Sequence, residues 1–242
     1  MTDYSEIFAQ RAHQYHAAMQ RYPQARDGEF LALLEDLPAG ARDLLDVPSG
    51  GGYLNAYLDA TRALTACDFS TGFAGSSIPL GQPEALPFAD AAFDAVLSLT
   101  GLHHVSLERQ AAFFAECHRL LRPSGHLLIG EVLAGSPVAA FLNDFVHRHN
   151  SQGHVGVFFD VEFPPRLAAA GFEVTAMTVR HYPWCFEDEA AMVFYCRNMF
   201  GIDRGSDAEI LAGLRDYLDY RIEGDGRIAL PWQLVFFQAV KR

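Results

Sequence analysis

The sequence predicts an α/β fold built on a doubly wound, mostly parallel sheet. Beyond the first forty residues, short apolar runs of strand length alternate with stretches whose apolar residues recur at helical spacing. The chain has 242 residues, of which 50% are hydrophobic, enough for one α/β domain with a substantial buried core. These two observations together favour a single layered domain.

The first forty residues are expected to form two helices ahead of the sheet. Apolar side chains recur at helical spacing from Ile7 to Met19 and again from Phe30 to Leu37. Pro38, Ala39 and Gly40 then end the second helix.

Strands and helices are expected to alternate after this helical segment. Apolar runs predict strands over 44–47, 63–67, 93–99 and 126–133, and helices over 53–60 and 106–121. Further along, helices are expected over 137–149, 163–170, 187–200 and 207–221, with strands over 172–180 and 232–240. The last strand is apolar on both faces, which suits a covered position in a sheet.

Composition excludes several classes of partner. The chain has 18 Lys and Arg against 30 Asp and Glu, a net charge of −12, and no basic run, so no nucleic-acid partner is expected. It shows neither a signal peptide nor an apolar run long enough to span a bilayer, so no membrane association and a cytoplasmic location are expected. The four cysteines form no C-x-x-C pair and are expected to be reduced.

No metal is predicted from the ten histidines. The sequence contains no H-E-x-x-H motif and no Cys/His spacing typical of zinc sites. His147, His149 and His154 lie near Asp144, and they are interpreted as a solvated helix end.

The most informative segment is the glycine-rich turn after the first predicted strand. Asp46 ends that strand, and Pro48, Ser49 and the glycines 50–52 separate it from the next helix. Such a turn lets a ligand approach the backbone, and the N–H groups at the start of the helix are free to bind it. Asp68 closes the second strand, where an acid binds ribose hydroxyls in folds of this type.

Five ordered segments resemble class I S-adenosylmethionine-dependent methyltransferases of the small-molecule type. The turn resembles the family's D-x-G-x-G-x-G motif, with Pro48 at the first glycine position. Residues 81–88 resemble G-D-A-E-x-L-P-F, and 93–98 resemble F-D-V-V. Residues 102–105 match L-H-H-V, and 119–127 resemble R-x-L-K-P-G-G-x-L.

The resemblance implies a seven-stranded, Rossmann-like methyltransferase sheet whose last strand runs antiparallel to the others. A single domain would comprise an N-terminal helical cap (1–40), a cofactor-binding half (41–135) and a C-terminal part with a helical lid and the last strands (136–242). The implied cofactor is S-adenosyl-L-methionine, whose methyl group passes to a small-molecule acceptor by in-line displacement. Few residues separate Asp68 from Glu84, so the third strand and its preceding helix are expected to be shortened.

The candidate cofactor-binding residues lie in the turn, at the strand ends and in the cap. They are Asp46, Pro48, Ser49, Gly50, Gly51, Gly52, Asp68, Phe69, Gln82, Glu84, Ala85, Leu86, Thr100 and Arg26. Phe69 is expected to pack against adenine, and Gln82 replaces the acid that accepts a hydrogen bond from the adenine amino group in relatives.

His103 and His104 are the candidate catalytic residues. They follow the carboxyl end of the strand over 93–99, where open α/β sheets bind ligands, and either could take a proton from the acceptor. The candidate acceptor-binding residues are Tyr15, Glu131, Trp184 and Tyr195. Packing or capping roles remain open for the histidines, capping of a surface loop for Glu131, and core packing for the aromatic residues.

Three other functions remain as alternatives. A nicotinamide dehydrogenase is disfavoured because the glycine spacing is not G-x-G-x-x-G. A catalytically silent subunit that binds S-adenosylmethionine would retain the same residues. Methylation of a nucleic acid is disfavoured by the negative charge, and the long lid favours an enclosed small acceptor over a protein or a carrier-bound one. The sequence identifies neither the acceptor atom nor the oligomeric state.

Overall fold

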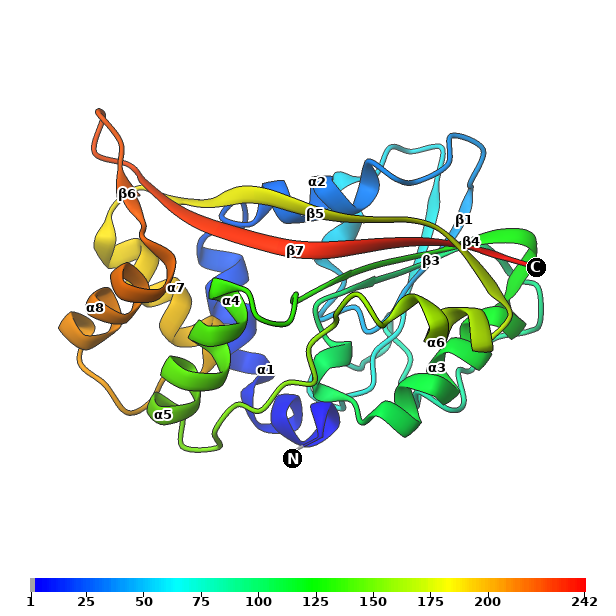
Figure 1. Cartoon of the computed structure of the whole chain (residues 1–242), viewed down its shortest axis with the longest axis horizontal. Coiled ribbons are helices and arrows are strands. Elements are labelled where there is room, and N and C mark those ends of the chain that lie inside the picture. Colours follow the sequence, from blue (N-terminus) through cyan, green and yellow to red (C-terminus); the bar gives the residue numbers. More distant parts are fainter. Residues whose placement is uncertain (1–2) are drawn as a thin grey trace.

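The protein, described here over residues 3–242 of a computed structural model, is built on one seven-stranded sheet (Figure 1). The strand order is β2-β1-β3-β4-β7-β5, with β6 paired to β7 outside this path. Strands β1 to β4 are parallel, whereas β7 runs antiparallel to both β4 and β5, so the predicted orientation of the last strand is confirmed. The strands are β1 (Asp43–Asp46), β2 (Ala63–Ala66), β3 (Phe93–Leu99), β4 (Leu121–Glu131), β5 (Phe172–Phe186), β6 (Arg221–Ile222) and β7 (Ile228–Lys241).

Helices precede the sheet and follow its strands. The longer ones are α1 (Tyr4–Arg21), α2 (Asp27–Leu34), α3 (Leu107–Leu120), α6 (Pro164–Ala169), α7 (Glu189–Phe200) and α8 (Asp207–Leu218). One continuous helical segment comprises α4 (Pro137–Ala140), the π-helical η3 (Phe141–Val146) and α5 (His147–His149). Side-chain caps explain several of the starts: Asp3 caps α1, Ser106 caps α3, and Ser206 forms a capping box with Glu209 on α8.

The two faces of the sheet are covered by different helices. Successive residues of β1 point to opposite faces, so Leu44 packs into the core beneath α2 and Leu45 into the core beneath α3. Helix α2 contacts β3, β4 and β5, while α3 contacts β4 and α6 contacts β5. Figure 1 shows α2 on one side of the sheet and α3 and α6 on the other.

The helix expected over 53–60 is wrong in extent. The structure forms only a short 3₁₀ helix, η1 (Tyr53–Tyr57), because the left-handed glycines 50–52 occupy the start of a short connection to β2. Helix α2 contacts η1 and packs on this face, where the crossover helix after β1 would otherwise lie. The N-terminal segment therefore builds part of the sheet's covering layer as well as a cap.

The segment after β2 is shortened as expected. Residues 67–92 contain neither a helix nor a strand beyond isolated bridges, one of which joins Asp68 to Leu80. No strand forms between β2 and β3, and the seventh strand of the sheet is the two-residue β6, which pairs with the first residues of β7.

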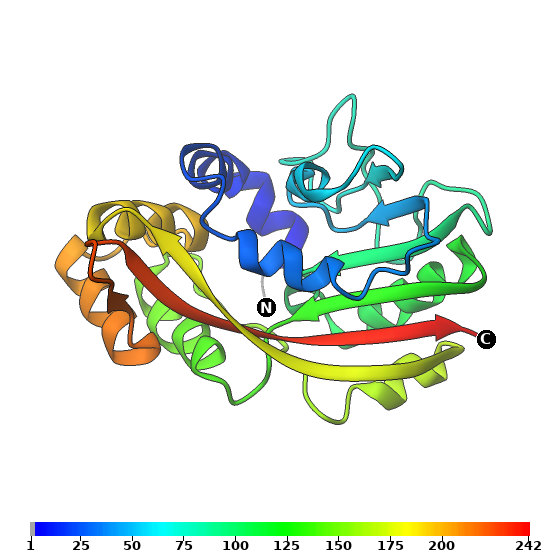
Figure 2. The same cartoon turned by 90° about the horizontal axis from the view of Figure 1, so that it is seen from above.

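Strands β5 and β7 extend further than the sequence predicts. They pair over their full lengths and leave the central sheet as a twisted two-stranded ribbon that supports α7 and α8 (Figure 2). Helix α1 packs against α7, so cap and lid meet beside the carboxyl ends of β1, β3 and β4 (Figure 1). No helix in the described chain is long and apolar enough to cross a membrane.

Candidate active site

Two adjoining cavities lie where cap and lid meet the carboxyl ends of the central strands. The turn cavity, of about 30 Å³, is lined by Asp46, Pro48, Ser49 and Gly50 together with aromatic residues of α1. The histidine cavity, of about 70 Å³, is lined by His103, His104, His154 and Arg11 together with aromatic residues of the lid. Both cavities share the lining residues Phe8, Tyr15, Arg26 and Thr100.

The glycine turn brings its backbone against both the second strand and α1. Gly50, Gly51 and Gly52 have φ values of +55°, +98° and +77°, a conformation that glycine adopts without a steric penalty. A Cβ atom at Gly51 would lie 2.6 Å from Cε1 of His16. The turn therefore has no room for side chains at this position.

Asp46 and Asp68 lie on either side of this turn, and both are buried. Oδ2 of Asp46 has no hydrogen-bond partner within residues 3–242, and burial, with Asp68 nearby, raises the pKa of Asp46 well above its usual range. Asp68 accepts hydrogen bonds from the N–H groups of Gly50 (2.8 Å) and Ser70 (2.9 Å) and from the hydroxyl of Tyr4 (3.2 Å). Burial raises the pKa of Asp68 to about 6. The free oxygen of Asp46 is a position where a donor or cation from a ligand would be stabilised.

Residues of α1 and α3 contact several of the other candidate cofactor residues. The Tyr4 ring lies over Asp68 and contacts Phe69, which is itself packed edge-on against Phe113. Arg109 of α3 donates to Oε1 of Gln82 (3.0 Å) and to Oε2 of Glu84 (3.2 Å). The candidates that line neither cavity are Gly51, Gly52, Asp68, Phe69, Gln82, Glu84, Ala85 and Leu86.

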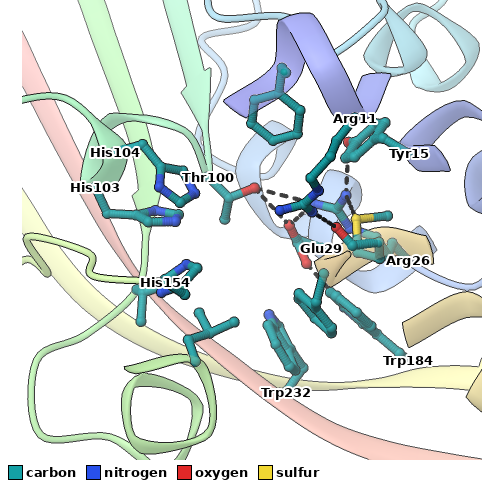
Figure 3. Close-up of a pocket in the computed structure, with 15 residues that line it drawn as sticks. Arg11, Tyr15, Arg26, Glu29, Thr100, His103, His104, His154, Trp184 and Trp232 are labelled. Atoms are coloured by element: carbon teal, nitrogen blue, oxygen red, sulfur yellow. Dashed lines mark hydrogen bonds and ion pairs between the residues drawn. The ribbon is translucent and has the colours of Figure 1, made fainter. Parts of the chain in front are cut away.

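A buried polar network lines the histidine cavity (Figure 3), and three of its members, Tyr15, Arg26 and Thr100, also line the turn cavity. Arg26 forms an ion pair with Glu29 and donates to the hydroxyls of Tyr15 (3.0 Å) and Thr100 (3.2 Å). The indole N–H of Trp184 donates to Glu29 Oε2 at 3.0 Å. Sequence reasoning missed Glu29, because acids flank the apolar run 30–34 on both sides and nothing in the local pattern distinguishes the buried, paired one.

Glu131 does not line either cavity, so the structure does not place it against an acceptor. Its side chain is fully buried at the end of β4 and accepts hydrogen bonds from the N–H groups of Gly101 (2.8 Å) and Leu102 (2.7 Å) and from Nδ1 of His103 (2.8 Å). Burial alone would raise the pKa of Glu131, but His103 and the backbone donors outweigh burial and hold that pKa below its usual range. Glu131 therefore fixes the orientation of His103.

His104 and His154 complete a cluster with His103. The ring centres are 4.2 Å apart for His103 and His104, 4.9 Å for His104 and His154, and 5.7 Å for His103 and His154. Burial, together with the neighbouring His103, lowers the pKa of both His104 and His154, so both rings are uncharged near neutral pH. Figure 3 shows the three rings gathered on one side of the cavity.

The expectation of a solvated helix end is wrong for His154. This residue lies in the loop after α5, is 8% exposed, and its Nδ1 is 2.9 Å from Oδ1 of Asn143. His147 and His149 remain outside the cavity and hydrogen-bond to backbone carbonyls. Local spacing does not reveal this position, because the loop after α5 returns to η2 (Leu102–His104), where the N–H of Val157 donates to the carbonyl of His103.

The lid supplies an aromatic wall to the histidine cavity. Trp184 of β5 stacks on Trp232 of β7, with ring centres 4.1 Å apart, and both line the cavity. Tyr195 does not: it is fully buried in the lid core and its hydroxyl lies 3.1 Å from the sulfur of Met19. Of the two acceptor-binding candidates in the lid, Trp184 therefore lines the cavity and Tyr195 belongs to the core.

Arg11 of α1 is a further lining residue that sequence reasoning missed. Its guanidinium donates to the carbonyl of Met199 at 3.0 Å, whereas its Nε is buried without a partner in the described chain. Burial lowers the pKa of Arg11 to about 10, so the group remains a cation at neutral pH. The histidine cavity therefore combines a flat aromatic wall with one incompletely bonded cation.

The parallel strands, the glycine turn and the cavities at the strand ends define a Rossmann-like domain of the methyltransferase type. A family profile described as "Methyltransferase domain" matches residues 45–129, from β1 to β4. Over this segment the chain is similar to the methyltransferase domain that the profile describes. The matched residues all precede the C-terminal part of the chain (136–242), which contains the lid.

Two methyltransferases are similar in sequence to part of the chain. A demethylmenaquinone methyltransferase from Beutenbergia cavernae is 36% identical over 97 residues, covering 36% of this chain and 40% of that protein. A malonyl-[acyl-carrier protein] O-methyltransferase from Coxiella burnetii is 28% identical over 158 residues, covering 60% of this chain and 54% of that protein. The matches thus span about half or less of these relatives. In fold, the chain is similar to a methyltransferase from Thermotoga maritima, with a TM-score of 0.61, 18% identity, and coverage of 99% of this chain and 100% of the other.

Proposed function

We propose that the protein transfers a methyl group from S-adenosyl-L-methionine to a small-molecule acceptor by in-line displacement. The observation that carries this proposal is the unpartnered, buried oxygen of Asp46 beside the glycine turn, in a cavity that adjoins an aromatic one. In this proposal residues 41–135 bind the cofactor, while residues 1–40 and 136–242 enclose the acceptor. When bound, the cofactor supplies a sulfonium methyl group that needs only alignment with the acceptor, not covalent help from the protein.

The residues around the turn fit the cofactor in chemical type. We assign Asp46 to the ammonium group of its methionine part and Asp68 to its ribose hydroxyls, because carboxylates accept charge-assisted hydrogen bonds from such donors. Pro48, Ser49 and the glycines 50–52 would let the ligand approach the backbone. Phe69 and the segment 82–86 are assigned to adenine, and Thr100 and Arg26 to the junction with the acceptor.

Cofactor binding requires α1 to move in this proposal. The turn cavity of about 30 Å³ is far smaller than a nucleoside, and the hydroxyl of Tyr4 occupies the hydrogen-bonding position on Asp68 that ribose would take. Helices before the first strand are therefore assigned the role of a cover that opens for the cofactor and closes over it.

The acceptor is assigned to the histidine cavity. Trp184 and Trp232 would provide aromatic surface for a flat acceptor, and Arg11 would stabilise an anionic or hydrogen-bond-accepting group on it. Nδ1 of His103 is held by Glu131, so its Nε2 is the nitrogen available to receive a proton from the acceptor. His104 adjoins His103, and Tyr15 lies between the two cavities.

Calorimetric titration with S-adenosylhomocysteine tests the cofactor assignment. The chain should bind S-adenosylhomocysteine, and NAD should give no heat. Asp68→Asn removes the charge but keeps one acceptor oxygen for Gly50 or Ser70, and it should weaken binding by at least about tenfold, or 1.4 kcal/mol. The matched control Asp225→Asn, in the exposed turn before β7, should bind as the wild type does. An unchanged affinity in folded Asp68→Asn would contradict the assignment.

Turnover separates an enzyme from a silent binding subunit. Small-molecule extract incubated with the protein and methyl-labelled cofactor should yield a labelled product detectable by mass spectrometry. Cofactor binding without any labelled product would favour the silent subunit.

A further inference from the structure

We propose that His103, His104 and His154 form a binding site for a divalent transition-metal ion, with Zn²⁺ the best match to three imidazole ligands. One ligand atom from each of the three buried residues lies within 4.8 Å of the others. No other group of three His, Cys, Asp or Glu side chains meets this spacing within residues 3–242. Imidazole nitrogen suits Zn²⁺, and the related ions Co²⁺ and Ni²⁺, better than it suits Mg²⁺ or Ca²⁺.

The spacing of the rings is close to that of a tetrahedral site. Imidazole nitrogens bind Zn²⁺ at about 2.0–2.1 Å, which places three such nitrogens about 3.3 Å apart and their ring centres about 5 Å apart. The observed ring-centre distances, 4.2 to 5.7 Å, lie on both sides of that value. Movement of each nitrogen by less than about 1 Å would bring all three to bonding distance.

Two of the three rings form a hydrogen bond through Nδ1, which is the arrangement found in histidines that bind a metal ion through Nε2. Nδ1 of His103 donates to the carboxylate of Glu131 at 2.8 Å, and Nδ1 of His154 faces Oδ1 of Asn143 at 2.9 Å. Asn143 is fixed in turn, because its Oδ1 also accepts from the N–H of Gly156 at 2.9 Å. Metal-binding histidines characteristically donate their second nitrogen to a carboxylate or carbonyl oxygen in this way. Nε2 of both rings is thereby left for the ion. In the metal-bound chain His103 would not accept a proton, and the ion would instead lower the pKa of an acceptor oxygen bound to it.

The cavity provides a fourth position beside the cluster. Three protein ligands with one open position are the arrangement of catalytic zinc sites, whereas structural sites use four protein ligands. The cation Arg11 lines the same cavity with its Nε unpartnered, so an anionic fourth ligand would be stabilised by both the ion and the guanidinium. Resting on the proposed function, this favours acceptors with an ionisable oxygen, such as an enol, a phenol or a carboxylic acid.

Titration of the chelator-treated, tag-free chain with Co²⁺ tests the site directly. We expect one equivalent to bind and to give the intense visible absorption of four-coordinate Co²⁺, which Zn²⁺ then displaces. His154→Gln should lower the affinity for both ions at least tenfold. His13→Gln, which alters an exposed histidine of α1, is the matched control and should bind as the wild type does.

The opposite results overturn the proposal. Absence of the absorption band in the wild type, or wild-type affinity in folded His154→Gln, would show that the cluster is not a metal site. If circular dichroism shows that His154→Gln does not fold, His104→Gln provides the same comparison. Titration of the wild type and of each variant with S-adenosylhomocysteine distinguishes the two proposals. If the protein binds metal but not S-adenosylhomocysteine, only the proposed function is contradicted. If it binds S-adenosylhomocysteine but not metal, only the metal site is contradicted.

Discussion

The two cavities differ in how the protein uses its own polar groups. In the turn region, Asp68 is already hydrogen-bonded to Tyr4, Gly50 and Ser70, and α1 covers it. In the histidine cavity, Nδ1 of His103 and Nδ1 of His154 are held by Glu131 and Asn143, and both residues line the cavity. A ligand at the first site must displace protein contacts, whereas the imidazole rings of the second are oriented before any ligand arrives.

The largest effect is expected from His103→Gln, which alters only the preformed cavity. Loss of the imidazole should lower turnover by about 10²–10⁴-fold, whether the ring accepts a proton or holds an ion. S-Adenosylhomocysteine affinity, measured by calorimetry, should stay within about threefold of the wild type, less than 1 kcal/mol. A parallel loss of affinity would mean that the two cavities do not function separately.

The pH dependence of cofactor affinity should follow Asp68. Burial raises its pKa to about 6, and ribose hydroxyls donate to the ionised form, so binding releases a proton. Affinity for S-adenosylhomocysteine should therefore fall as the pH drops below about 6, by up to about tenfold per pH unit. Asp68→Asn, titrated over the same range, should show a flatter profile. A profile that is equally steep in this variant would assign the proton to another group, with the neighbouring Asp46 the first candidate.

The raised pKa of Asp68 affects folding stability in the opposite direction: the free energy of unfolding falls as the pH rises, whereas cofactor affinity increases. An acid whose pKa is higher in the folded than in the unfolded chain contributes stability below the usual value of about 4, and this contribution is lost as the pH rises through about 6. Chemical denaturation of the wild type and Asp68→Asn at pH 5 and pH 8 would measure this contribution. Asp68→Asn should show the smaller loss of stability between the two pH values.

A smaller effect is expected from Trp184→Phe, which keeps an aromatic ring in the wall but removes the hydrogen bond to Glu29. Loss of one hydrogen bond to a charged group should lower the free energy of unfolding by about 1.5 kcal/mol. The smaller ring also offers an acceptor less aromatic surface, so the acceptor's Michaelis constant should rise by up to roughly tenfold. Tyr195→Phe is the comparison, because Tyr195 lies outside the cavity. Equal effects of the two replacements would place Tyr195 in the acceptor site after all.

The smallest effect, and the only gain, is expected from Tyr4→Phe. This replacement removes the hydroxyl that competes for Asp68 while leaving the ring in the core. S-Adenosylhomocysteine should bind about three- to tenfold more tightly, because a hydrogen bond worth about 0.5–1.5 kcal/mol no longer has to be broken. Weaker binding would indicate that the Tyr4 hydroxyl contacts the cofactor.

Local sequence patterns predicted the central sheet and the residues at its strand ends. The glycine turn, Asp46 and the histidine pair follow buried strands, so their place at one edge of the sheet follows from the parallel topology. The strands β5 and β7 were predicted too short. Pro183 and Pro231 face each other in register within the paired ribbon, and a proline in a sequence ordinarily indicates the end of a strand.

The rest of the site could not be predicted, because it depends on contacts between distant segments. His154, Arg11 and Trp232 reach the histidine cavity from a loop, from α1 and from β7 respectively. None belongs to a local pattern that distinguishes a lining residue from a surface or core residue. Their convergence is a property of how cap and lid pack together.

Helix α1 contacts both cavities, which has a consequence for the order in which ligands bind. Tyr4 covers Asp68, and Arg11, two turns further along the same rigid helix, lines the histidine cavity. Withdrawing the helix to admit the cofactor also withdraws the guanidinium, and an acceptor held by that guanidinium keeps the helix in place. In the proposed function the cofactor therefore has to enter first, and an acceptor that arrives before it should slow cofactor entry and act as a substrate inhibitor.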